Sequence, residues 1–320
     1  MYDLTLKHGR PGLPVVVLIH GLGMNRHFWR DAARCPAMGG LGPLTIFLDG
    51  KPPANNGSLF STGVPNQALT GLADYLVEQG YAIAAWSQTQ PLGPAAVAVG
   101  ELARVMARVR ETWPGTPVYL VGHSRGGIIA RHYLLDTGGR EVAGLISIGS
   151  PHAGTRLAGY AEYLRPVGMI LERLIPDEVR GGLPIALKRL ADFLRSPAIR
   201  ELQPDASYLR DLASPLPGHL RLMSFGGTDP ALFRLYVRSR PENPWKVLSL
   251  PDLFLKVLPP GRLPAELQPG AGDGLVAAGS AVLAGGRHLD MARNHVGLAF
   301  TPALQQQLAE FLEGGAAGRE

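Results

Sequence analysis

The sequence predicts an α/β fold in which helices cover both faces of a mostly parallel central sheet. Short apolar runs bounded by turn residues recur along the chain, and segments with helical periodicity lie between them. The runs are continuous rather than alternating, which is typical of parallel strands buried on both faces. With 320 residues, 46% of them hydrophobic, the chain is long enough for one such domain with a sizeable insertion.

The expected elements follow one another in a regular order. The strands cover residues 15–19, 81–86, 118–121, 145–148 and 220–225, and the helices cover residues 67–78, 95–110 and 127–135. Reactive groups collect at the carboxyl ends of the strands in a parallel sheet. Because His20 and Ser124 each follow an expected strand, we expect both at this edge.

Two segments interrupt the alternation of strand and helix. Residues 24–65 are longer than an ordinary strand-to-helix connection and contain Gly, Pro and Asn clusters around an extra expected strand at 44–48. A loop of this length is usually functional or partly disordered. Residues 155–217 are amphipathic helical pieces separated by prolines. We expect them to form a helical cap, or lid, over the strand ends, between the N-terminal part of the core (1–154) and its C-terminal part (218–320).

The composition argues against several classes of protein. The net charge of +5 comes almost wholly from arginine, but there is no Lys/Arg block or RNA-binding aromatic signature. We therefore expect no nucleic-acid partner and at most transient contact with a lipid interface. Cys35 is the only cysteine, so an internal disulfide and a zinc-dependent scaffold are excluded, and we expect no cofactor.

The hydropathy of the chain bears on its location. No apolar stretch reaches the length of a membrane span, and residues 1–14 contain no hydrophobic signal core. We therefore expect a cytoplasmic protein, or a secreted one if an export signal has been removed from this sequence.

The pentapeptide GHSRG at residues 122–126 lies between an expected strand and an expected helix. This is the context of a nucleophile elbow, a sharp turn that exposes a serine hydroxyl to a histidine base. Gly122 and Gly126 lack a Cβ and let the strand and helix backbones approach, while Ser124 itself is expected in a strained conformation. Ser124 is therefore the candidate nucleophile.

Attack by this serine on an ester would create an oxyanion, which needs two preorganised backbone N–H donors. The natural pair is the N–H of Arg125, directly after the nucleophile, and the N–H of Leu22, in the loop after the first core strand. The simpler interpretation of His20 and Gly21 is a tight exit from that strand.

The candidate acid should follow the nucleophile and precede the base. Asp273 stands between two glycines, ahead of an apolar turn, where it could hold an imidazole in one tautomer. Asp229, at the end of an expected strand, is the alternative.

The candidate base should lie near the C-terminus, on a loop before the last helix. His295 meets this condition, because Thr301 and Pro302 follow it as a helix start. We expect His288 and His219 at the surface, and we expect His123 and His152 to pack or hydrogen-bond near the elbow.

These motifs together resemble the α/β-hydrolases of the bacterial lipase and esterase group, which includes triacylglycerol lipases. The resemblance spans nearly the whole chain and rests on HGL at 20–22, GHSRGG at 122–127, GSPHAGT at 149–155, IRELQPDASYL at 199–209, GDGLV at 272–276 and NHV at 294–296. It implies a carboxylic-ester hydrolase that cleaves hydrophobic acyl esters through a Ser-His-Asp triad and an acyl-enzyme intermediate. Two alternatives use the same fold: an acyltransferase with the same triad, and a non-catalytic ligand-binding protein.

The sequence departs from this group in three places. Extracellular members often carry a calcium ligand, an aspartate, two residues beyond the catalytic histidine, but Gly297 occupies that position here. We therefore expect no such calcium site. Cys35 alone cannot form the disulfide of some relatives, and the insertion after Met24 replaces a compact loop.

Overall fold

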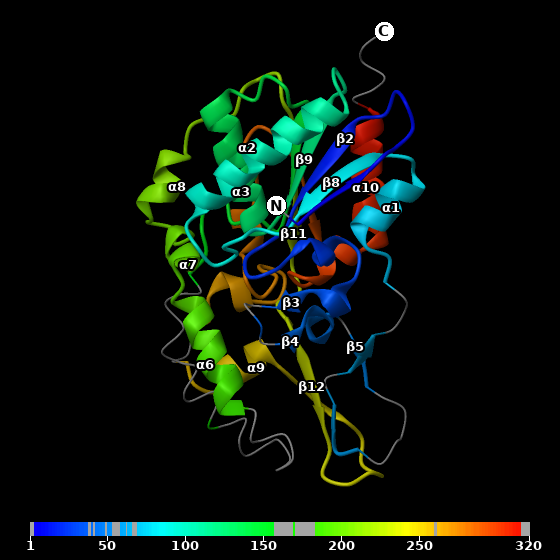
Figure 1. Cartoon of the computed structure of the whole chain (residues 1–320). Helices are drawn as coiled ribbons and strands as arrows, with labels where there is room; N and C mark the ends of the chain where they lie inside the picture. Colours follow the sequence, from blue (N-terminus) through cyan, green and yellow to red (C-terminus); the bar gives the residue numbers. More distant parts are fainter. Residues whose placement is uncertain are drawn as a thin grey trace.

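A computed structural model describes residues 3–37, 40, 42–48, 50–52, 58–61, 63–65, 69–156, 169, 183–258 and 261–314. Its centre is a seven-stranded sheet in the order β1-β8-β2-β9-β10-β11-β14, of which Figure 1 labels β2, β8, β9 and β11. β1 runs antiparallel to β8, and the other neighbours are parallel. The strands are β1 (Leu4–Lys7), β2 (Val15–Ile19), β8 (Ala82–Trp86), β9 (Val118–His123), β10 (Gly144–Ile148), β11 (Arg221–Gly227) and β14 (Arg287–Met291).

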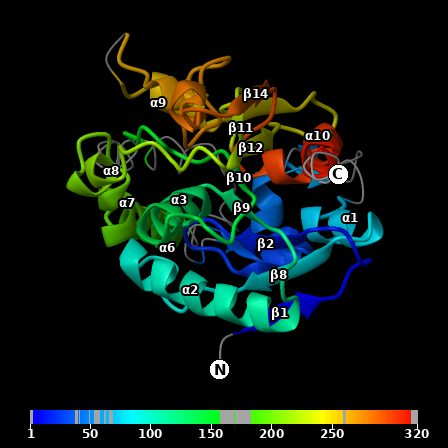
Figure 2. The same cartoon turned by 90° about the horizontal axis from the view of Figure 1, so that it is seen from above.

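Helices cover both faces of this sheet. α1 (Leu72–Glu78) and α10 (Pro302–Glu313) lie on one face, and α2 (Ala95–Thr112) and α3 (Arg125–Thr137) lie on the other (Figure 2). Alternate side chains of β2 enter the two cores: Val16 and Leu18 pack in the cluster that contains α1 and α10, and Val17 packs in the cluster that contains α2 and α3. Both faces of the strand therefore need apolar residues, which explains the continuous apolar runs.

The remaining elements lie outside the main sheet. A small sheet has the order β13-β12-β6, and two short ladders pair β3 with β4 and β5 with β7. The bounds are β3 (Pro36–Ala37), β4 (Gly42–Pro43), β5 (Gly50–Lys51), β6 (Phe60–Ser61), β7 (Val64–Pro65), β12 (Arg234–Val237), β13 (Lys246–Ser249), α6 (Leu183–Leu194), α7 (Pro197–Glu201), α8 (Ser207–Asp211) and α9 (Leu250–Leu255). The short 3₁₀ helices are η1 (Arg26–Trp29), η2 (Ala32–Arg34), η3 (Leu44–Phe47), η5 (Ala265–Leu267), η6 (Ala278–Ala281) and η7 (Gly297–Phe300).

The core strands and helices predicted from the sequence are confirmed, with bounds that shift by a few residues. The strand predicted at 44–48 is wrong, because η3 occupies this segment. Leu44 and Phe47 are both buried in the same core cluster. Residues three apart share a face in a 3₁₀ helix, whereas they point to opposite faces of a strand.

The division of the chain into core and cap remains a prediction. Residues 157–168 and 170–182 of the expected cap, and several residues of the 24–65 insertion, lie outside the described residues. The described remainder of the cap contains α6, α7 and α8. Within the described part of the chain, no helix combines the length and apolar character needed to cross a membrane.

Candidate active site

Ser124 stands at a sharp turn between β9 and α3. Its φ of 54° and ψ of −127° are strained values, and among the described residues no other non-glycine has a positive φ. A Cβ on Gly122 would lie 2.3 Å from the backbone nitrogen of Gly127, and one on Gly126 would lie 2.1 Å from the carbonyl oxygen of Ile19. Only glycine fits at both positions, as the elbow motif predicts.

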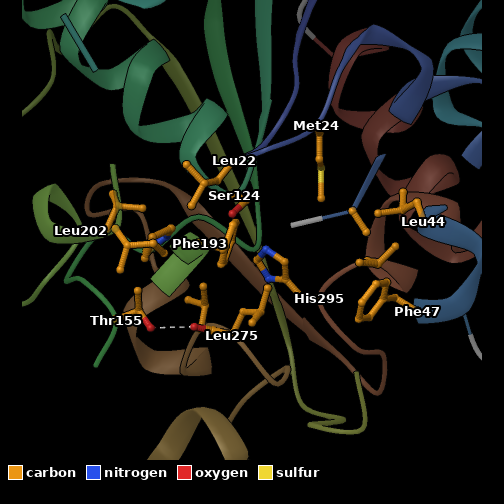
Figure 3. A pocket seen from close by; sticks show the side chains of 15 residues that line it. Leu22, Met24, Leu44, Phe47, Ser124, Thr155, Phe193, Leu202, Leu275 and His295 are labelled. Carbon is orange, nitrogen blue, oxygen red and sulfur yellow. Dashed lines mark hydrogen bonds between the residues drawn. The ribbon is translucent and has the colours of Figure 1, made fainter. Parts of the chain in front are cut away.

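His295 and Asp273 form a buried pair. The Nδ1 of His295 lies 2.7 Å from Oδ2 of Asp273, and both side chains are 1% exposed. The other oxygen, Oδ1, accepts the N–H groups of Leu275 at 2.9 Å and Val276 at 2.7 Å. Because the carboxylate accepts from Nδ1, the proton of the neutral imidazole resides there and Nε2 keeps its lone pair. His295 and Ser124 line the same pocket (Figure 3).

Gly149 makes room for this pair at the end of β10. Its φ is 57°, and a Cβ there would lie 3.2 Å from Nδ1 of His295 and 3.3 Å from Oδ2 of Asp273. A side chain at this position would press on the hydrogen bond that orients the imidazole.

The alternative acid, Asp229, is engaged elsewhere. Its Oδ2 lies 2.7 Å from Nη2 of Arg234, and its Oδ1 accepts the N–H of Ala231 at 3.0 Å. The structure therefore pairs His295 with Asp273.

The N–H groups of Leu22 and Arg125 have no backbone or side-chain acceptor among the residues that the structure describes. Their neighbour Gly23 behaves differently, because its N–H donates to the carbonyl of Pro91 at 3.1 Å. Two unengaged donors beside a strained serine are the chemical requirement for holding a developing oxyanion.

His20 fixes the loop that carries Leu22. Its ring is fully buried, and it bonds Gly21 O through Nδ1 at 2.9 Å and the N–H of Gln88 through Nε2 at 3.0 Å. Since Nε2 accepts, Nδ1 is the donor. Burial lowers the pKa of His20 to about 4, so the ring stays neutral near pH 7. A Cβ on Gly21 would lie 2.9 Å from Nδ1 of His123 and 3.0 Å from the Cβ of Ser124, so a larger residue at position 21 would crowd both side chains.

The pocket around Ser124 and His295 is apolar and encloses about 530 Å³, including the part open to solvent. Its apolar side chains come from both inserted segments and from the core: Leu22, Met24, Ala37, Leu44, Phe47, Pro151, Phe193, Ile199, Leu202, Leu275, Val276 and Val296. Met24, Leu44 and Phe47 lie on one side of the reacting groups, and Leu22, Phe193 and Leu202 lie on the other (Figure 3). The remaining polar lining residue, Thr155, donates its hydroxyl to the carbonyl of Leu275 at 2.7 Å. No charged side chain of the described residues lines this pocket.

Comparisons with known proteins address the fold. The sequence model described as alpha/beta hydrolase fold matches residues 72–184. The mature form of Bacillus licheniformis lipase BlEst2 superposes with a TM-score of 0.58 at 16% identity, covering 97% of both chains. The metagenomic carboxyl esterase MGS0156 superposes with a TM-score of 0.51 at 16% identity, covering 96% of this chain and 77% of that one. No curated protein sequence matches the chain.

The chain has the α/β-hydrolase fold. These two solved structures are a lipase and a carboxyl esterase, and the sequence motifs indicated the same bacterial lipase and esterase group. At these identities the superpositions establish the fold.

Within this α/β-hydrolase fold, the side chain of Arg125 forms a buried link that sequence reasoning missed. The side chain is 1% exposed, and its Nη2 donates to the carbonyl of Gly93 and lies 3.5 Å from Oε2 of Glu201 on α7. The same carboxylate accepts the N–H of Ala95, at the start of α2, at 2.9 Å. Burial lowers the pKa of Arg125. The link thus joins Arg125, the residue after Ser124, to α7 and to the start of α2. The sequence indicated this link only by placing a long arginine side chain in a turn too crowded to leave it exposed.

Asn294 is a second residue that sequence reasoning missed. Its Nδ2 donates to the carbonyls of Phe47 and Ala231, both at 3.0 Å, and its Oδ1 accepts the N–H of Gly297 at 2.8 Å. Both polar atoms of the buried Asn294 amide are therefore hydrogen-bonded. These bonds stabilise the loop that carries His295 and connect this loop to Phe47 in the pocket wall.

The other candidate histidines have local partners. His288 is in contact with the hydroxyl of Ser224 at 2.8 Å and with Asp290 at 3.1 Å, and His219 bonds the carbonyl of Gly139 at 3.1 Å. Ser224 is fully buried within the sheet, so this second Ser-His-Asp arrangement has no opening to a substrate.

The described residues contain no group of three or more His, Cys, Asp or Glu side chains arranged to hold a metal ion. Cys35 is buried, and burial raises the pKa of its thiol to about 11.

Proposed function

We propose that the protein is a carboxylic-ester hydrolase, a lipase or esterase with a serine nucleophile. The observation that carries this proposal is the buried His295–Asp273 pair in the same pocket as the strained Ser124. The two similar solved structures, one named a lipase and the other a carboxyl esterase, support it.

In the proposed acylation step, Nε2 of His295 takes the proton of the Ser124 hydroxyl as Oγ attacks the ester carbonyl. Asp273 keeps the imidazole in the Nδ1–H tautomer and stabilises the imidazolium that forms. The N–H groups of Leu22 and Arg125 stabilise the negative oxygen of the tetrahedral intermediate. When this intermediate collapses, His295 gives its proton to the leaving alkoxide and the alcohol departs.

Deacylation repeats these roles with water. His295 removes a proton from water as its oxygen attacks the acyl carbonyl, and then returns a proton to Oγ of Ser124. The products are a carboxylic acid and the free serine. Each proton taken up by His295 is given back, so the cycle needs no external acid or base.

The substrate is an uncharged, hydrophobic ester. The pocket is lined by aliphatic and aromatic side chains, and its remaining hydroxyl, on Thr155, is already bonded to the backbone. A charged group on either side of the scissile bond would be desolvated there without a charged partner among the lining residues that the structure describes, which is strongly unfavourable. Apolar walls on both sides of the reacting groups favour apolar acyl and alcohol portions.

Two measurements test the proposal. Purified protein is assayed on p-nitrophenyl esters from acetate to palmitate, and its serine is labelled with a fluorophosphonate. We expect ester hydrolysis and labelling in the wild type, and neither in Ser124→Ala, with turnover lower by as much as about 10⁶. Unlabelled wild-type protein would instead indicate a ligand-binding protein. Labelling together with a product that appears only when an alcohol or amine acceptor is added would indicate an acyltransferase.

A further inference from the structure

His123, the residue before the nucleophile, has no step in the reaction described above, and yet it contacts the base. We propose that His123 is a positioning residue, which holds the main chain of His295 at a fixed distance from Ser124. This inference rests on the proposed function, because it gives His123 a role in that reaction.

The central observation is one hydrogen bond. The ring of His123 is fully buried, and its Nε2 lies 2.9 Å from the carbonyl oxygen of His295. A carbonyl oxygen can only accept, so Nε2 carries the proton and Nδ1 carries none. Nδ1 has no hydrogen-bond partner among the described residues. Burial lowers the pKa of His123 well below its ordinary value, with the nearby His295 as a second cause, so the ring remains neutral.

The packing around His123 keeps its ring in one orientation. The Phe28 ring lies against it at a centroid distance of 4.4 Å and an angle of 33°, and the Trp29 ring stands perpendicular to it at 6.5 Å. On the remaining sides are the imidazole of His295, at 4.8 Å between centroids, and Gly21, where a Cβ would lie 2.9 Å from Nδ1 of His123. The ring thus lies between the proposed base and the loop that carries the proposed oxyanion donor.

The main chain of His295 is held on both sides. Its N–H donates to the carbonyl of Asp273 at 2.9 Å, and its carbonyl accepts from His123. Because His123 is covalently bonded to Ser124, the second contact sets the base directly relative to the nucleophile. A displacement of about 1 Å in such a geometry can lower a rate by about 10²-fold.

Three variants test this role: His123→Phe removes the donor and keeps a ring, His123→Gln returns an N–H donor, and His152→Phe is the matched control. His152 is also buried, and its Nε2 bonds the hydroxyl of Ser147 at 2.9 Å rather than the base. We expect kcat on a short p-nitrophenyl ester to fall about 10- to 100-fold in His123→Phe. We expect KM to change little, most of the loss to be recovered in His123→Gln, and kcat to stay near the wild-type value in His152→Phe.

A second readout does not depend on turnover. In ¹⁵N-histidine-labelled protein, the Nδ1 proton of His295 shared with Asp273 should give a low-field resonance, and His123 should show the Nε2–H tautomer. We expect the resonance to shift or broaden in His123→Phe and to persist unshifted in His152→Phe. An Nδ1–H tautomer of His123 in the wild type would overturn the proposal even if the Phe variant does not fold.

The positioning role of His123 would also be overturned if kcat fell equally in His123→Phe and His152→Phe. The same holds if kcat in His123→Gln were no higher than in His123→Phe. The proposed function can fail separately. In that case Ser124 would be unreactive towards fluorophosphonate while the His295 resonance still responded to substitution of His123.

Discussion

Asp273 holds His295 through two hydrogen bonds, one from the ring and one from the main chain. The ring bond joins Nδ1 to Oδ2 at 2.7 Å, and the main-chain bond joins the N–H of His295 to the carbonyl of Asp273 at 2.9 Å. The carboxylate selects the tautomer of the imidazole, and the main-chain bond holds the loop in place. A substitution of the side chain alone should therefore separate the two effects.

Asp273→Asn should lower turnover by roughly 10⁴ while the loop of His295 stays in place, because an amide favours the wrong tautomer of the base. The measurement is kcat on p-nitrophenyl esters. Asp229→Asn is the control, since Asp229 pairs with Arg234, and it should retain near wild-type turnover. If Asp229→Asn shows the larger loss, the assignment of the acid is incorrect.

Glu201→Ala should destabilise the protein by about 3 kcal/mol, because it leaves the buried guanidinium of Arg125 without its carboxylate. It also removes the acceptor for the N–H of Ala95 at the start of α2. Glu141→Ala is a matched control: Glu141 pairs with Arg110 at the surface, and such pairs contribute about 1 kcal/mol or less. Urea unfolding measures both, and similar losses for the two variants would contradict the structural role of Arg125.

The unfolding free energy should decrease as the pH falls from about 6.5 towards 4. Burial lowers the pKa of His20 to about 4 and that of His152 to about 3, against 6.5 in the unfolded chain. The unfolded state therefore binds protons in this range that the folded state does not. The contribution of the two neutral histidines to the unfolding free energy is fully present above pH 6.5. As the pH falls below this value, the unfolding free energy decreases by up to about 1.4 kcal/mol per pH unit for each of them.

Denaturant titrations at pH 7 and pH 5 measure this slope. His152→Phe should reduce the number of protons taken up on unfolding, which this slope reports, by up to one, whatever its effect on the unfolding free energy at pH 7. A slope that does not change with this substitution would show that His152 is already protonated, or equally neutral, in both states.

EDTA should leave the hydrolysis rate unchanged, because Gly297 offers no side chain at the position where extracellular members of the resembled group often carry a calcium-binding aspartate. The assay compares EDTA-treated protein with the same sample after calcium is added back. Loss of activity that calcium restores would reveal a metal site.

The sequence predicts the buried strands well and the edge strands poorly. The run of apolar residues in β2 reflects burial on both faces, so it was visible without a structure. β1 and β14 lie at the two edges of the sheet. In β14 the sequence RHLDM is mostly polar and only partly buried, so no apolar run marks it. The 3₁₀ helix at Leu44 could not be distinguished from a strand, because a short apolar run fits both.

The site shows the same contrast between local and distant signals. Ser124, Asp273 and His295 stand in short motifs whose glycines and order along the chain are visible locally. Asn294 and Arg125 stand in two of the same motifs, but the motifs do not reveal what their side chains contact, because those partners are distant in sequence. The partner of Asn294 at Phe47 is 247 residues away, and the partner of Arg125 at Glu201 is 76 residues away.

Part of the pocket wall and the residues proposed to react come from different parts of the chain. Ser124 follows β9 and His295 follows β14, whereas Met24, Leu44 and Phe47 lie within residues 24–65 and Phe193 and Leu202 lie within residues 155–217. A combinatorial library restricted to the pocket-lining positions within 24–65 and 155–217 would therefore vary the shape of the pocket while every variant keeps Ser124, Asp273 and His295.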